Sequence, residues 1–334
     1  MSPASGVVIP KLDSVKFQDA ATTADGKARA SVSFTKLQTL WINTGTLCNL
    51  ACNSCYIESS PTNDRLVYVS TEEVETFLEE IIRDEHETEE IGFTGGEPFM
   101  NPEIIEMLNL ALSLNYRVLI LTNAMKPMRK VCNDLMALNA KYGDRLVLRV
   151  SLDHYTQSQH EKERGKQSWA PAIEGLSWLS QNGFNVRVAG RTRWCETEKG
   201  LRAGYSKLFK EHDLKINPEN SIDLVLFPEI DGNADVPEIT TECWDILNVS
   251  PNAMMCASSR MVVKRRGMVS PVVVPCTLLP YGARFEMGVT LADATTKVPL
   301  NHPHCAKFCV LGGGSCSQGR LTSPGLQALA CQAR

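Results

Sequence analysis

The sequence predicts an α/β protein in which a parallel sheet, assembled from strand–helix units, is followed by a small cysteine-rich domain. Six apolar runs alternate with helical segments between residues 37 and 228, in units of about 30 residues, and this alternation is typical of βα repeats. The strands are apolar along their whole length, as strands covered on both faces are. Polar or cysteine-containing segments follow four of the strands, where the active sites of such sheets lie.

The units follow one another with short connections. The first helix shows a conventional start, because Ser70 or Thr71 can cap it and acidic residues fill its first turn. Its periodicity, and that of its successors, suits an incomplete (β/α)6 barrel as well as an open sheet. The predicted elements are strands at 37–45, 89–95, 117–123, 145–153, 185–192 and 221–228, and helices at 70–85, 102–115, 128–143, 168–183 and 198–213.

Three regions are expected along the chain. Residues 1–35 are rich in Ala, Ser, Thr and Asp without a sustained period, and we expect a loose N-terminal arm. Residues 36–240 carry the βα series. Residues 241–334 break that pattern: a β-hairpin turning near Arg266 and Gly267 is flanked by two cysteines, and a cysteine-dense loop follows. We expect a small second domain there, with a boundary known to roughly ten residues.

The composition excludes several classes of protein. Hydrophobic residues make up 43% and charged residues 22% of the 334, as in ordinary globular proteins. A net charge of −4 gives no reason to expect nucleic acid or a membrane surface as partner. No apolar run has the length of a membrane span, and the N-terminus lacks the pattern of a signal peptide. We therefore expect a cytoplasmic protein.

The cysteines are the most specific signal. Twelve are present, and clustered thiols in a reducing compartment more often bind metal or act in redox chemistry than form disulfides. Cys48, Cys52 and Cys55 lie in one loop after the first strand, with no fourth Cys or His close by in sequence. A structural zinc site would need four ligands, whereas three thiolates on a four-iron cluster leave one iron open to a substrate or cofactor.

These cysteines form a Cys-x3-Cys-x2-Cys motif, with "GGEP" after the second strand and "SLD" after the fourth. In this register the sequence resembles the radical S-adenosylmethionine (radical SAM) superfamily from about residue 38 to 226. The resemblance implies a partial (β/α)6, TIM-like barrel and a [4Fe–4S] cluster on Cys48, Cys52 and Cys55. It also implies S-adenosylmethionine bound to the open iron and cleaved to a 5′-deoxyadenosyl radical, with an electron donor such as flavodoxin or ferredoxin.

The strand-end motifs supply candidate cofactor contacts. Gly95 and Gly96 allow close approach of the backbone to a ligand, and the Glu97 carboxylate suits an ammonium group; in the family this motif holds the methionine amino group. Small polar residues end the next two strands, and an arginine follows the fifth. The remaining candidates are Thr122, Asn123, Ser151, Asp153 and Arg191 or Arg193, each with a turn, a helix cap or a solvated charge as its alternative.

The residues on either side of the third cysteine depart from the family pattern. In the family the residue before the third cysteine is aromatic and packs on the adenine, but here it is Ser54, with Tyr56 just beyond Cys55. Either Tyr56 or the backbone near Ile57 contacts the adenine, or the pocket is built differently. Arg164 lies in a segment that also resembles the family, and we expect it to hold its loop by a structural ion pair.

The C-terminal region contains a second cysteine group. Two cysteines flank the hairpin and a Cys-x3-Cys pair follows, which resembles the auxiliary-cluster domain of the SPASM/Twitch subgroup. The resemblance implies a second [4Fe–4S] cluster, and zinc is the alternative for the same residues. The candidate ligands are Cys256, Cys276, Cys305 and Cys309, with Cys316 as a replacement for one of them and His302 or His304 as further zinc ligands.

The resulting prediction is a radical SAM enzyme that abstracts hydrogen from a small biosynthetic intermediate and then oxidises or rearranges it with the help of the auxiliary cluster. Only about 35 residues precede the barrel, which disfavours a peptide-recognition domain there. A peptide-modifying maturase and a non-catalytic carrier of clusters or zinc are the alternatives. No single residue is identifiable as a proton donor or radical relay; Cys195, after the fifth strand, has a packed thiol as its plainer reading.

Overall fold

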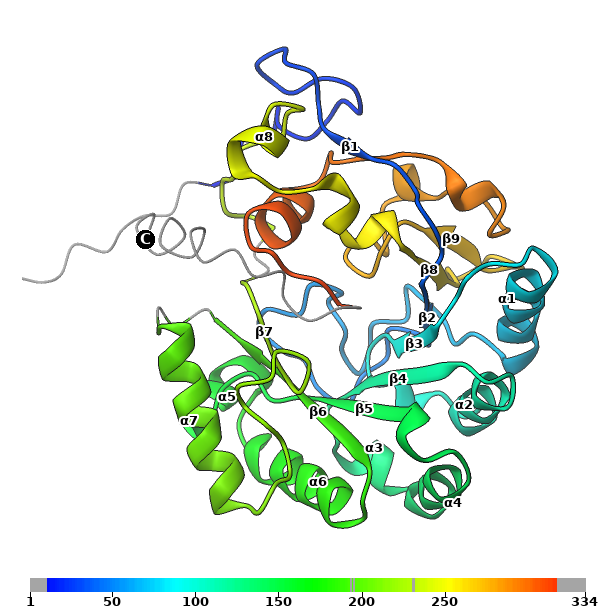
Figure 1. Cartoon of the computed structure of the whole chain (residues 1–334), viewed down its shortest axis with the longest axis vertical. Coiled ribbons are helices and arrows are strands. Elements are labelled where there is room, and N and C mark those ends of the chain that lie inside the picture. Colours follow the sequence, from blue (N-terminus) through cyan, green and yellow to red (C-terminus); the bar gives the residue numbers. More distant parts are fainter. Residues whose placement is uncertain (1–10, 193, 195, 230–231, 317–334) are drawn as a thin grey trace, which may run out of the picture.

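A mostly parallel sheet of eight strands organises the molecule (Figure 1). The computed structural model describes residues 11–192, 194, 196–229 and 232–316. The strands are β1 Ser31–Val32, β2 Thr39–Asn43, β3 Glu90–Thr94, β4 Arg117–Thr122, β5 Leu146–Ser151, β6 Asn185–Arg191, β7 Leu224–Phe227, β8 Ser259–Val263, β9 Val272–Val274 and β10 Val298–Pro299. The α-helices are α1 Thr71–Arg83, α2 Ile104–Ser113, α3 Lys126–Arg129, α4 Cys132–Tyr142, α5 Gln157–Arg164, α6 Trp169–Gln181, α7 Glu198–Glu211 and α8 Cys243–Leu247.

Strands β2 to β7 follow one another in chain order and pair in parallel. Helices α1, α2, α4, α6 and α7 lie along one side of this curved sheet, and most of the chain after residue 240 lies on the other (Figure 1). Strands β2 and β7 are not hydrogen bonded to each other among the described residues, so the six units form a partial barrel. The predicted α/β partial-barrel fold is confirmed.

Alternation along each strand divides its side chains between two cores. On β5, Leu148 and Val150 pack with the helices, whereas Val147 joins the cluster that includes the C-terminal cysteines. Arg149 and Ser151 therefore project from the same concave face of the sheet as Val147. Functional side chains from the strands, and from the loops that follow them, can meet at this face.

The first helix begins as its sequence predicts. The Ser70 hydroxyl accepts a hydrogen bond from the Glu73 amide, and the Glu73 carboxylate accepts one from the Ser70 amide. This reciprocal capping box satisfies two amides that would otherwise lack partners. The Glu103 carboxylate accepts from the Thr71 amide at 2.8 Å, which ties the start of α1 to the segment before α2.

The C-terminal region is joined to the barrel more closely than expected. Strand β8 pairs in parallel with β2, and β9 returns antiparallel to β8, so the predicted hairpin is confirmed but extends the barrel sheet. Val262, Val273 and Leu291 belong to the core beneath the barrel helices. Sequence patterning did not reveal this, because an edge strand of one sheet and a strand of a separate domain have the same local pattern.

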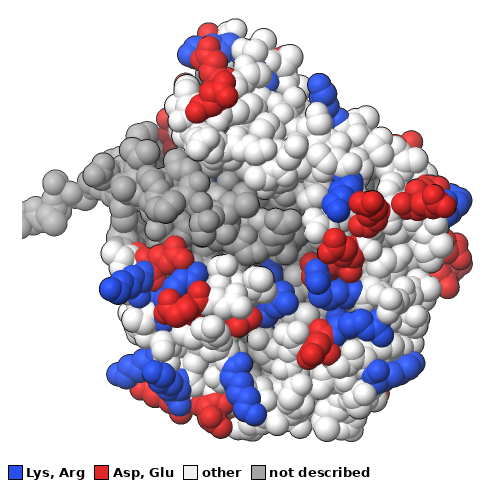
Figure 2. Space-filling model, viewed as in Figure 1, with Lys and Arg blue, Asp and Glu red and all other residues white. Residues whose placement is uncertain are grey.

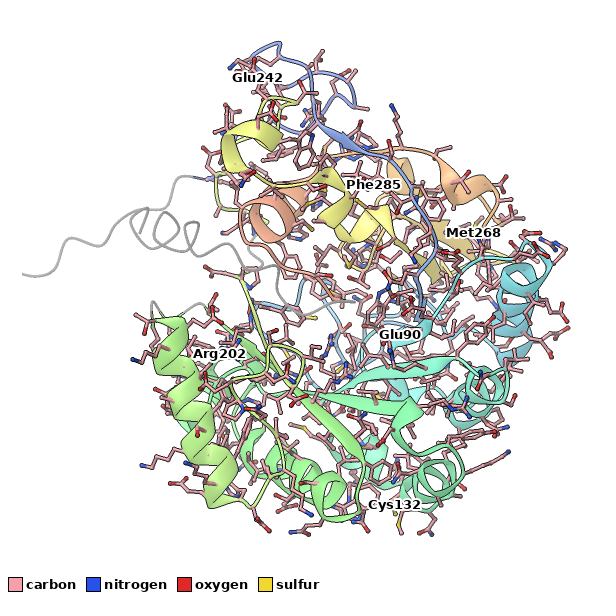
Figure 3. All side chains as sticks on the ribbon, in the orientation of Figure 1. Glu90, Cys132, Arg202, Glu242, Met268 and Phe285 are labelled. Carbon is pink, nitrogen blue, oxygen red and sulfur yellow. The ribbon has the colours of Figure 1, made fainter. Side chains whose placement is uncertain are left out.

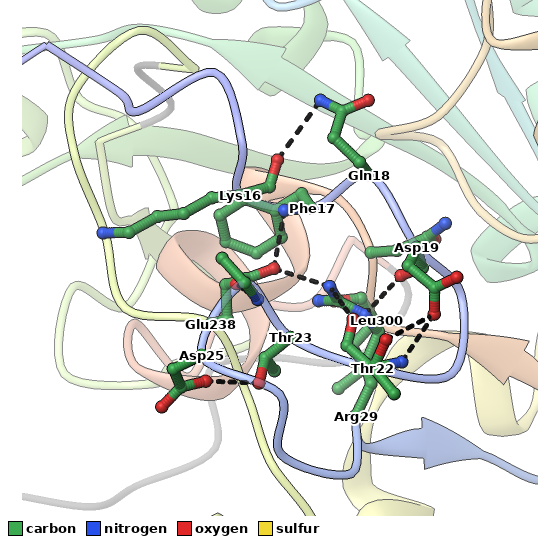
Figure 4. Close-up of polar contacts among 12 residues, drawn as sticks. Lys16, Phe17, Gln18, Asp19, Thr22, Thr23, Asp25, Arg29, Glu238 and Leu300 are labelled. Carbon is green, nitrogen blue, oxygen red and sulfur yellow. Dashed lines mark hydrogen bonds and ion pairs between the residues drawn. The ribbon is translucent and has the colours of Figure 1, made fainter.

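The expectation of a loose arm is wrong for residues 11–35. Phe17 is 2% exposed and Val32 is fully buried, and β1 pairs with β10. The Arg29 guanidinium forms a buried ion pair with Glu238 at 2.5 Å (Figure 4). The sequence of this segment shows no helix or strand periodicity because contacts with a distant part of the chain fix its position.

Two further features complete the fold. The predicted cysteine-dense loop contains a wide helical turn, of the π type, over Cys305–Val310. Basic and acidic side chains are interspersed over the face seen in Figure 2, in keeping with the small net charge. No helix in the described part of the chain has the length and apolar character needed to cross a bilayer.

Candidate cofactor and metal sites

The loop after β2 carries three cysteines at the edge of the sheet. Cys48 is 6% exposed, and Cys52 and Cys55 are half-buried. Burial raises the pKa of the Cys48 thiol to about 12 and also raises that of Cys52, whereas the Arg164 guanidinium lowers both. These thiols therefore need a compensating positive charge to bind as thiolates, and a metal supplies one.

The two glycines after β3 pack against the backbone that leads into Cys48. A Cβ atom on Gly95 would lie 2.4 Å from the Gly45 carbonyl oxygen, and one on Gly96 would lie 2.1 Å from that of Leu47. The Gly96 amide donates to the Gly45 carbonyl at 2.8 Å. The expected reason for these glycines, close approach of a ligand, is thus incomplete: the neighbour that excludes a side chain here is the loop before Cys48.

Glu97 points into the site from the same turn. It is 2% exposed, and its carboxylate accepts hydrogen bonds from the Thr122 hydroxyl and from the Asn123 amide, both at 2.8 Å. Burial raises the pKa of Glu97 to about 7, although these hydrogen bonds and Arg164 lower it. Since each carboxylate oxygen has two lone pairs, Glu97 retains the capacity to accept an ammonium group.

Asn123 links this acidic residue to the cysteine loop. Its side-chain amide donates to Asn49 Oδ1 at 2.9 Å and lies 4.0 Å from the Cys48 sulfur. The structure therefore brings together Glu97, Thr122, Asn123 and Cys48, which the sequence spreads over 76 positions. Parallel strands end at one edge, so these residues meet although no local pattern joins them.

A second network fixes the other side of the cysteine loop. The Ser54 hydroxyl donates to the Glu163 carboxylate and accepts from Arg191 Nη1 at 2.5 Å. Asn53 adds two bonds to backbone carbonyls of α5, from its amide to Glu163 at 2.7 Å and from its side chain to Lys162 at 2.5 Å. Arg191 thus lies beside the loop as expected of a cofactor contact, and Glu163 is a participant that sequence reasoning missed.

Asp153 differs from the expectation of a cofactor contact. Arg164 donates to both of its carboxylate oxygens, at 2.8 and 3.1 Å, and the Asp153 pKa is lowered because Arg164 and Arg191 outweigh the effect of burial. The carboxylate is committed to holding the loop after β5, and the predicted structural role of Arg164 is confirmed. Ser151 ends β5 on the concave face and is half-buried.

Tyr56 lies between the two cysteine groups. Burial, with the nearby sulfurs of Cys316 and Cys55, raises the pKa of its phenol. The ring also lines a cavity of about 690 Å³, the size of many ligand sites. The residues that line this cavity come from the cysteine loop (Asn53, Ser54, Cys55, Tyr56, Glu58), the segment after β7 (Glu229, Gly232, Asn233) and the C-terminal region (278–282, 284, 285 and 302–304).

Four of the five C-terminal cysteines surround one narrow cavity. They are Cys256, Cys276, Cys305 and Cys309, each at most 9% exposed. Apolar side chains line the rest of the cavity, among them Leu278 and Leu279, which also line the larger cavity described above. No three potential ligands in the described residues are spaced as around a single ion. Four thiols in an apolar lining form a donor set for a thiophilic metal group.

Cys316 is not part of that lining. Its sulfur accepts a hydrogen bond from the Thr277 hydroxyl at 3.2 Å, and its carbonyl accepts one from Arg149 Nη1 at 2.7 Å. His302 and His304 stack on each other, with ring centres 4.6 Å apart, and line the larger cavity. Arg149 was missed by sequence reasoning, although a lone arginine inside the apolar run "LVLRVS" could have signalled it.

Two of the scattered cysteines lie at the first residue of a helix. Cys132 begins α4 at the periphery of the molecule (Figure 3), and Cys243 begins α8. Arg193 and Cys195 lie outside the described residues.

The barrel segment that contains these sites has a recognisable sequence. A family model described as the radical SAM superfamily matches residues 42–192. This match confirms that the barrel segment resembles the radical SAM superfamily. The matched segment includes all three cysteines of the first loop, Glu97 and Ser151. The match agrees with the expected [4Fe–4S] and S-adenosylmethionine site in this segment, and the cysteine-rich region that follows fits the SPASM/Twitch-like subgroup.

Curated proteins with similar sequences agree with this match. The chain is 34% identical over 143 residues to the antilisterial bacteriocin subtilosin biosynthesis protein AlbA of Bacillus subtilis, covering 42% of this chain and 30% of AlbA. It is 29% identical over 137 residues to the mycofactocin maturase MftC of Mycolicibacterium smegmatis, covering 41% of this chain and 33% of MftC. The matched region thus spans about a third of the length of these relatives.

Solved structures share the fold at low identity. SuiB of Streptococcus suis, bound to its precursor peptide SuiA, superposes with a TM-score of 0.56 and 12% identity over 77% of this chain and 63% of SuiB. Native anSMEcpe with bound AdoMet gives a TM-score of 0.54 and 14% identity over 83% of this chain and 84% of that one. At these identities the likeness concerns the fold alone.

Proposed function

We propose that this radical SAM enzyme modifies a residue of a peptide, with Cys48, Cys52 and Cys55 as the ligands of its [4Fe–4S] cluster. The observation that carries the cofactor assignment is the convergence of Glu97, Asn123 and Cys48 at one edge of the sheet. When bound, the cluster and S-adenosylmethionine together supply a 5′-deoxyadenosyl radical for hydrogen abstraction. The contribution of the protein is to orient these groups and to exclude water.

Different residues around the cysteine loop contact different parts of S-adenosylmethionine. Glu97 accepts the ammonium group of S-adenosylmethionine, and a cation there favours the charged form of this carboxyl. Asn123 orients the loop through Asn49, and Thr122 fixes the Glu97 carboxylate. Arg191 lies near enough to the loop to attract the cofactor carboxylate, while Ser151 faces the same concave surface as a hydroxyl for the ribose. Tyr56 is the aromatic side chain next to the adenine.

The substrate occupies the cavity of about 690 Å³ beside the cysteine loop. Its walls come from the barrel on one side and from the C-terminal region on the other, so a bound segment contacts both. The mixture of acidic, amide and imidazole side chains with leucines and prolines suits a peptide, which has backbone donors and acceptors as well as side chains. Similar proteins support this choice: SuiB was solved bound to its precursor peptide SuiA, and AlbA is a biosynthesis protein of the bacteriocin subtilosin.

The C-terminal cysteines hold a second metal group. Cys256, Cys276, Cys305 and Cys309 are its ligands, and an auxiliary [4Fe–4S] cluster is the group we favour. Leu278 and Leu279 line both this cavity and the substrate cavity, which gives a short path for an electron that leaves an oxidised substrate.

Iron content tests the metal assignments. The protein is reconstituted without oxygen, and iron and sulfide are counted in the wild type and in a variant with Cys48, Cys52 and Cys55 replaced by Ala. We expect about eight irons per chain falling to about four, and loss of the spectral change that S-adenosylmethionine causes in the reduced protein. Replacement of Cys132 by Ala is the control. Absence of iron from the wild type contradicts the proposal.

Isotope transfer tests the substrate class. Extract of cells that produce the protein, grown in deuterated medium, is separated into peptide and small-molecule fractions and added to the reconstituted enzyme. Deuterium in the released 5′-deoxyadenosine marks the fraction that contains the substrate. We expect it with the peptide fraction and not after protease treatment of that fraction. Deuterium transfer from the small-molecule fraction alone would show that the substrate is a small biosynthetic intermediate instead.

A further inference from the structure

Arg260 on β8 is one of the largest fully buried side chains, at 1% exposure. Its guanidinium donates to backbone carbonyls: Nε to Ala294 at 2.6 Å, and Nη1 to Cys256 at 2.6 Å and to Ser259 at 2.7 Å. It also lies over the Phe34 ring, 4.3 Å from the ring centre. The residue is thereby fixed beside Cys256, one of the four cysteines of the C-terminal cavity.

This buried cation has no anionic partner in the described part of the chain. No carboxylate among the described residues forms an ion pair with it, whereas the buried guanidinium of Arg29 pairs with Glu238. Burial accordingly lowers the pKa of Arg260 to about 10, and the groups that act against this are Cys256 and Cys276. A buried charge without a counter-charge is strongly destabilising, so an anion is expected nearby once the protein is complete.

The four-cysteine cavity supplies such an anion. Four thiolates around a [4Fe–4S]²⁺ cluster, or around Zn²⁺, leave a net charge of about −2. Besides its cysteines, the cavity is lined by methionines, leucines and one valine, which cannot solvate that charge.

We propose that Arg260 is the charge partner of the C-terminal metal site, lowering the free energy of the thiolate-bound metal group through its fixed positive charge. The inference rests on the proposed binding of metal by Cys256, Cys276, Cys305 and Cys309. It holds for an iron–sulfur cluster and for zinc alike, because both leave the ligand set anionic. Arg260 touches no reacting atom in this scheme and is a positioning and charge-compensating residue.

A purely structural role of Arg260 would depend on its hydrogen bonds and not on its charge. Binding of the carbonyls of Ala294, Cys256 and Ser259 requires N–H donors but no charge. Arg260→Gln keeps an amide donor and removes the charge, whereas Arg260→Lys keeps the charge and loses the planar fork. The pair of variants therefore separates the two roles.

The test is a Co²⁺ titration of the full chain in the background in which Cys48, Cys52 and Cys55 are replaced by Ala. Sulfur-to-cobalt absorption reports binding at the C-terminal thiolates, and competition with a chelator gives the dissociation constant. We expect Arg260→Gln to weaken Co²⁺ binding about ten-fold or more, and Arg260→Lys to weaken it less than about three-fold. Arg202→Met is the control for loss of a buried arginine, because Arg202 lies on α7 and pairs with Glu198 (Figure 3).

Each result decides a separate point. No sulfur-to-cobalt absorption in the background protein overturns the proposed metal site and this inference with it. Absorption with equal affinity in the background protein and in Arg260→Gln overturns the inference alone, as does an equal loss in Arg260→Lys and Arg260→Gln. Far-ultraviolet circular dichroism checks folding; should Arg260→Gln not fold, Arg260→Asn takes its place, because it also keeps an amide donor without a charge.

Discussion

The Ser54 hydroxyl donates a hydrogen bond to the carboxylate of Glu163, 109 residues further along the chain. Ser54 immediately precedes Cys55, and Glu163 lies in the last turn of α5. Arg191 Nη1 donates to the same hydroxyl. An aromatic residue is expected at position 54 from the family resemblance, and here a polar network fixes the cysteine loop instead.

Removal of this hydroxyl should loosen the cluster loop. We expect Ser54→Ala to release iron to a chelator about five-fold faster than wild type, equivalent to one hydrogen bond of ~1 kcal/mol. Ser113→Ala, at the end of α2, is the control because its hydroxyl bonds only within that helix. Equal release rates in Ser54→Ala and wild type would mean that the bonds of Asn53 alone hold the loop.

Gly96 should not tolerate a side chain. A Cβ there would lie 2.1 Å from the Leu47 carbonyl oxygen, so the Gly96→Ala substitution must push the turn after β3 away from the loop before Cys48. We expect the free energy of unfolding of the iron-free protein to fall by about 2 kcal/mol, and binding of S-adenosylmethionine to the reconstituted protein to be lost. Gly200→Ala in α7 is the control, with its nearest neighbour at 3.2 Å and an expected change below about 1 kcal/mol. Urea unfolding measures the free energy of unfolding of both variants.

Glu97 should make the stability of the iron-free protein depend on pH. Burial raises its pKa to about 7, from an ordinary value of 4.5, so the folded state favours the protonated form. The associated stability is present below pH 4.5 and is lost as pH rises through 7, by about 3 kcal/mol at most.

The matched comparison isolates that contribution. Because Glu97→Gln cannot ionise, its stability relative to wild type should increase between pH 5 and 8, as measured by urea unfolding at each pH. Glu75→Gln, exposed on α1, should show no such trend. A constant difference between Glu97→Gln and wild type would show that this carboxyl does not titrate in that range.

Cys316 should be dispensable for metal binding. It lies outside the lining of the four-cysteine cavity and its sulfur accepts a hydrogen bond from Thr277. In the background with Cys48, Cys52 and Cys55 replaced by Ala, we expect Cys316→Ser to retain its metal and Cys305→Ser to lose most of it. Metal analysis after desalting measures this. Loss of metal in Cys316→Ser would show that the ligand set differs from the one proposed.

The ion pair between Arg29 and Glu238 should stabilise the N-terminal segment strongly. Their side chains are 1% and 6% exposed, and Glu238 also accepts from the Phe17 and Ala24 amides at 2.6 Å (Figure 4). Glu238→Gln leaves Arg29 buried without a counter-charge and should lower the free energy of unfolding by about 3 kcal/mol. Asp235→Asn, which breaks the more exposed pair with Lys16 at 2.6 Å, should cost less than about 1 kcal/mol. Similar losses for the two would contradict the importance of burial here.

Much of the barrel follows from local sequence. Apolar runs bounded by turns predicted β2 to β7, and the capping residue Ser70 predicted the start of α1. Both predictions were possible because strand and helix patterns depend on residues that are close together in the sequence. The cysteine spacing from Cys48 to Cys55 indicated a metal group for the same reason: all its ligands lie in one loop. Strand ends then predicted that Glu97 and Asn123 would lie near that loop.

Contacts between distant segments were decided by tertiary structure. The pairing of β8 with β2, the burial of residues 11–35 and the bonds from Ser54 to Glu163 and Arg191 depend on which surfaces meet, and surfaces far apart in sequence share no local period. The same holds for Cys316, which the spacing could not distinguish from Cys256, Cys276, Cys305 and Cys309. The sequence by itself determined the barrel units and the chemistry of the cysteine groups, because these depend on adjacent residues. The cavity between the two groups, and the uncompensated charge of Arg260 beside one of them, arise only when the chain is folded.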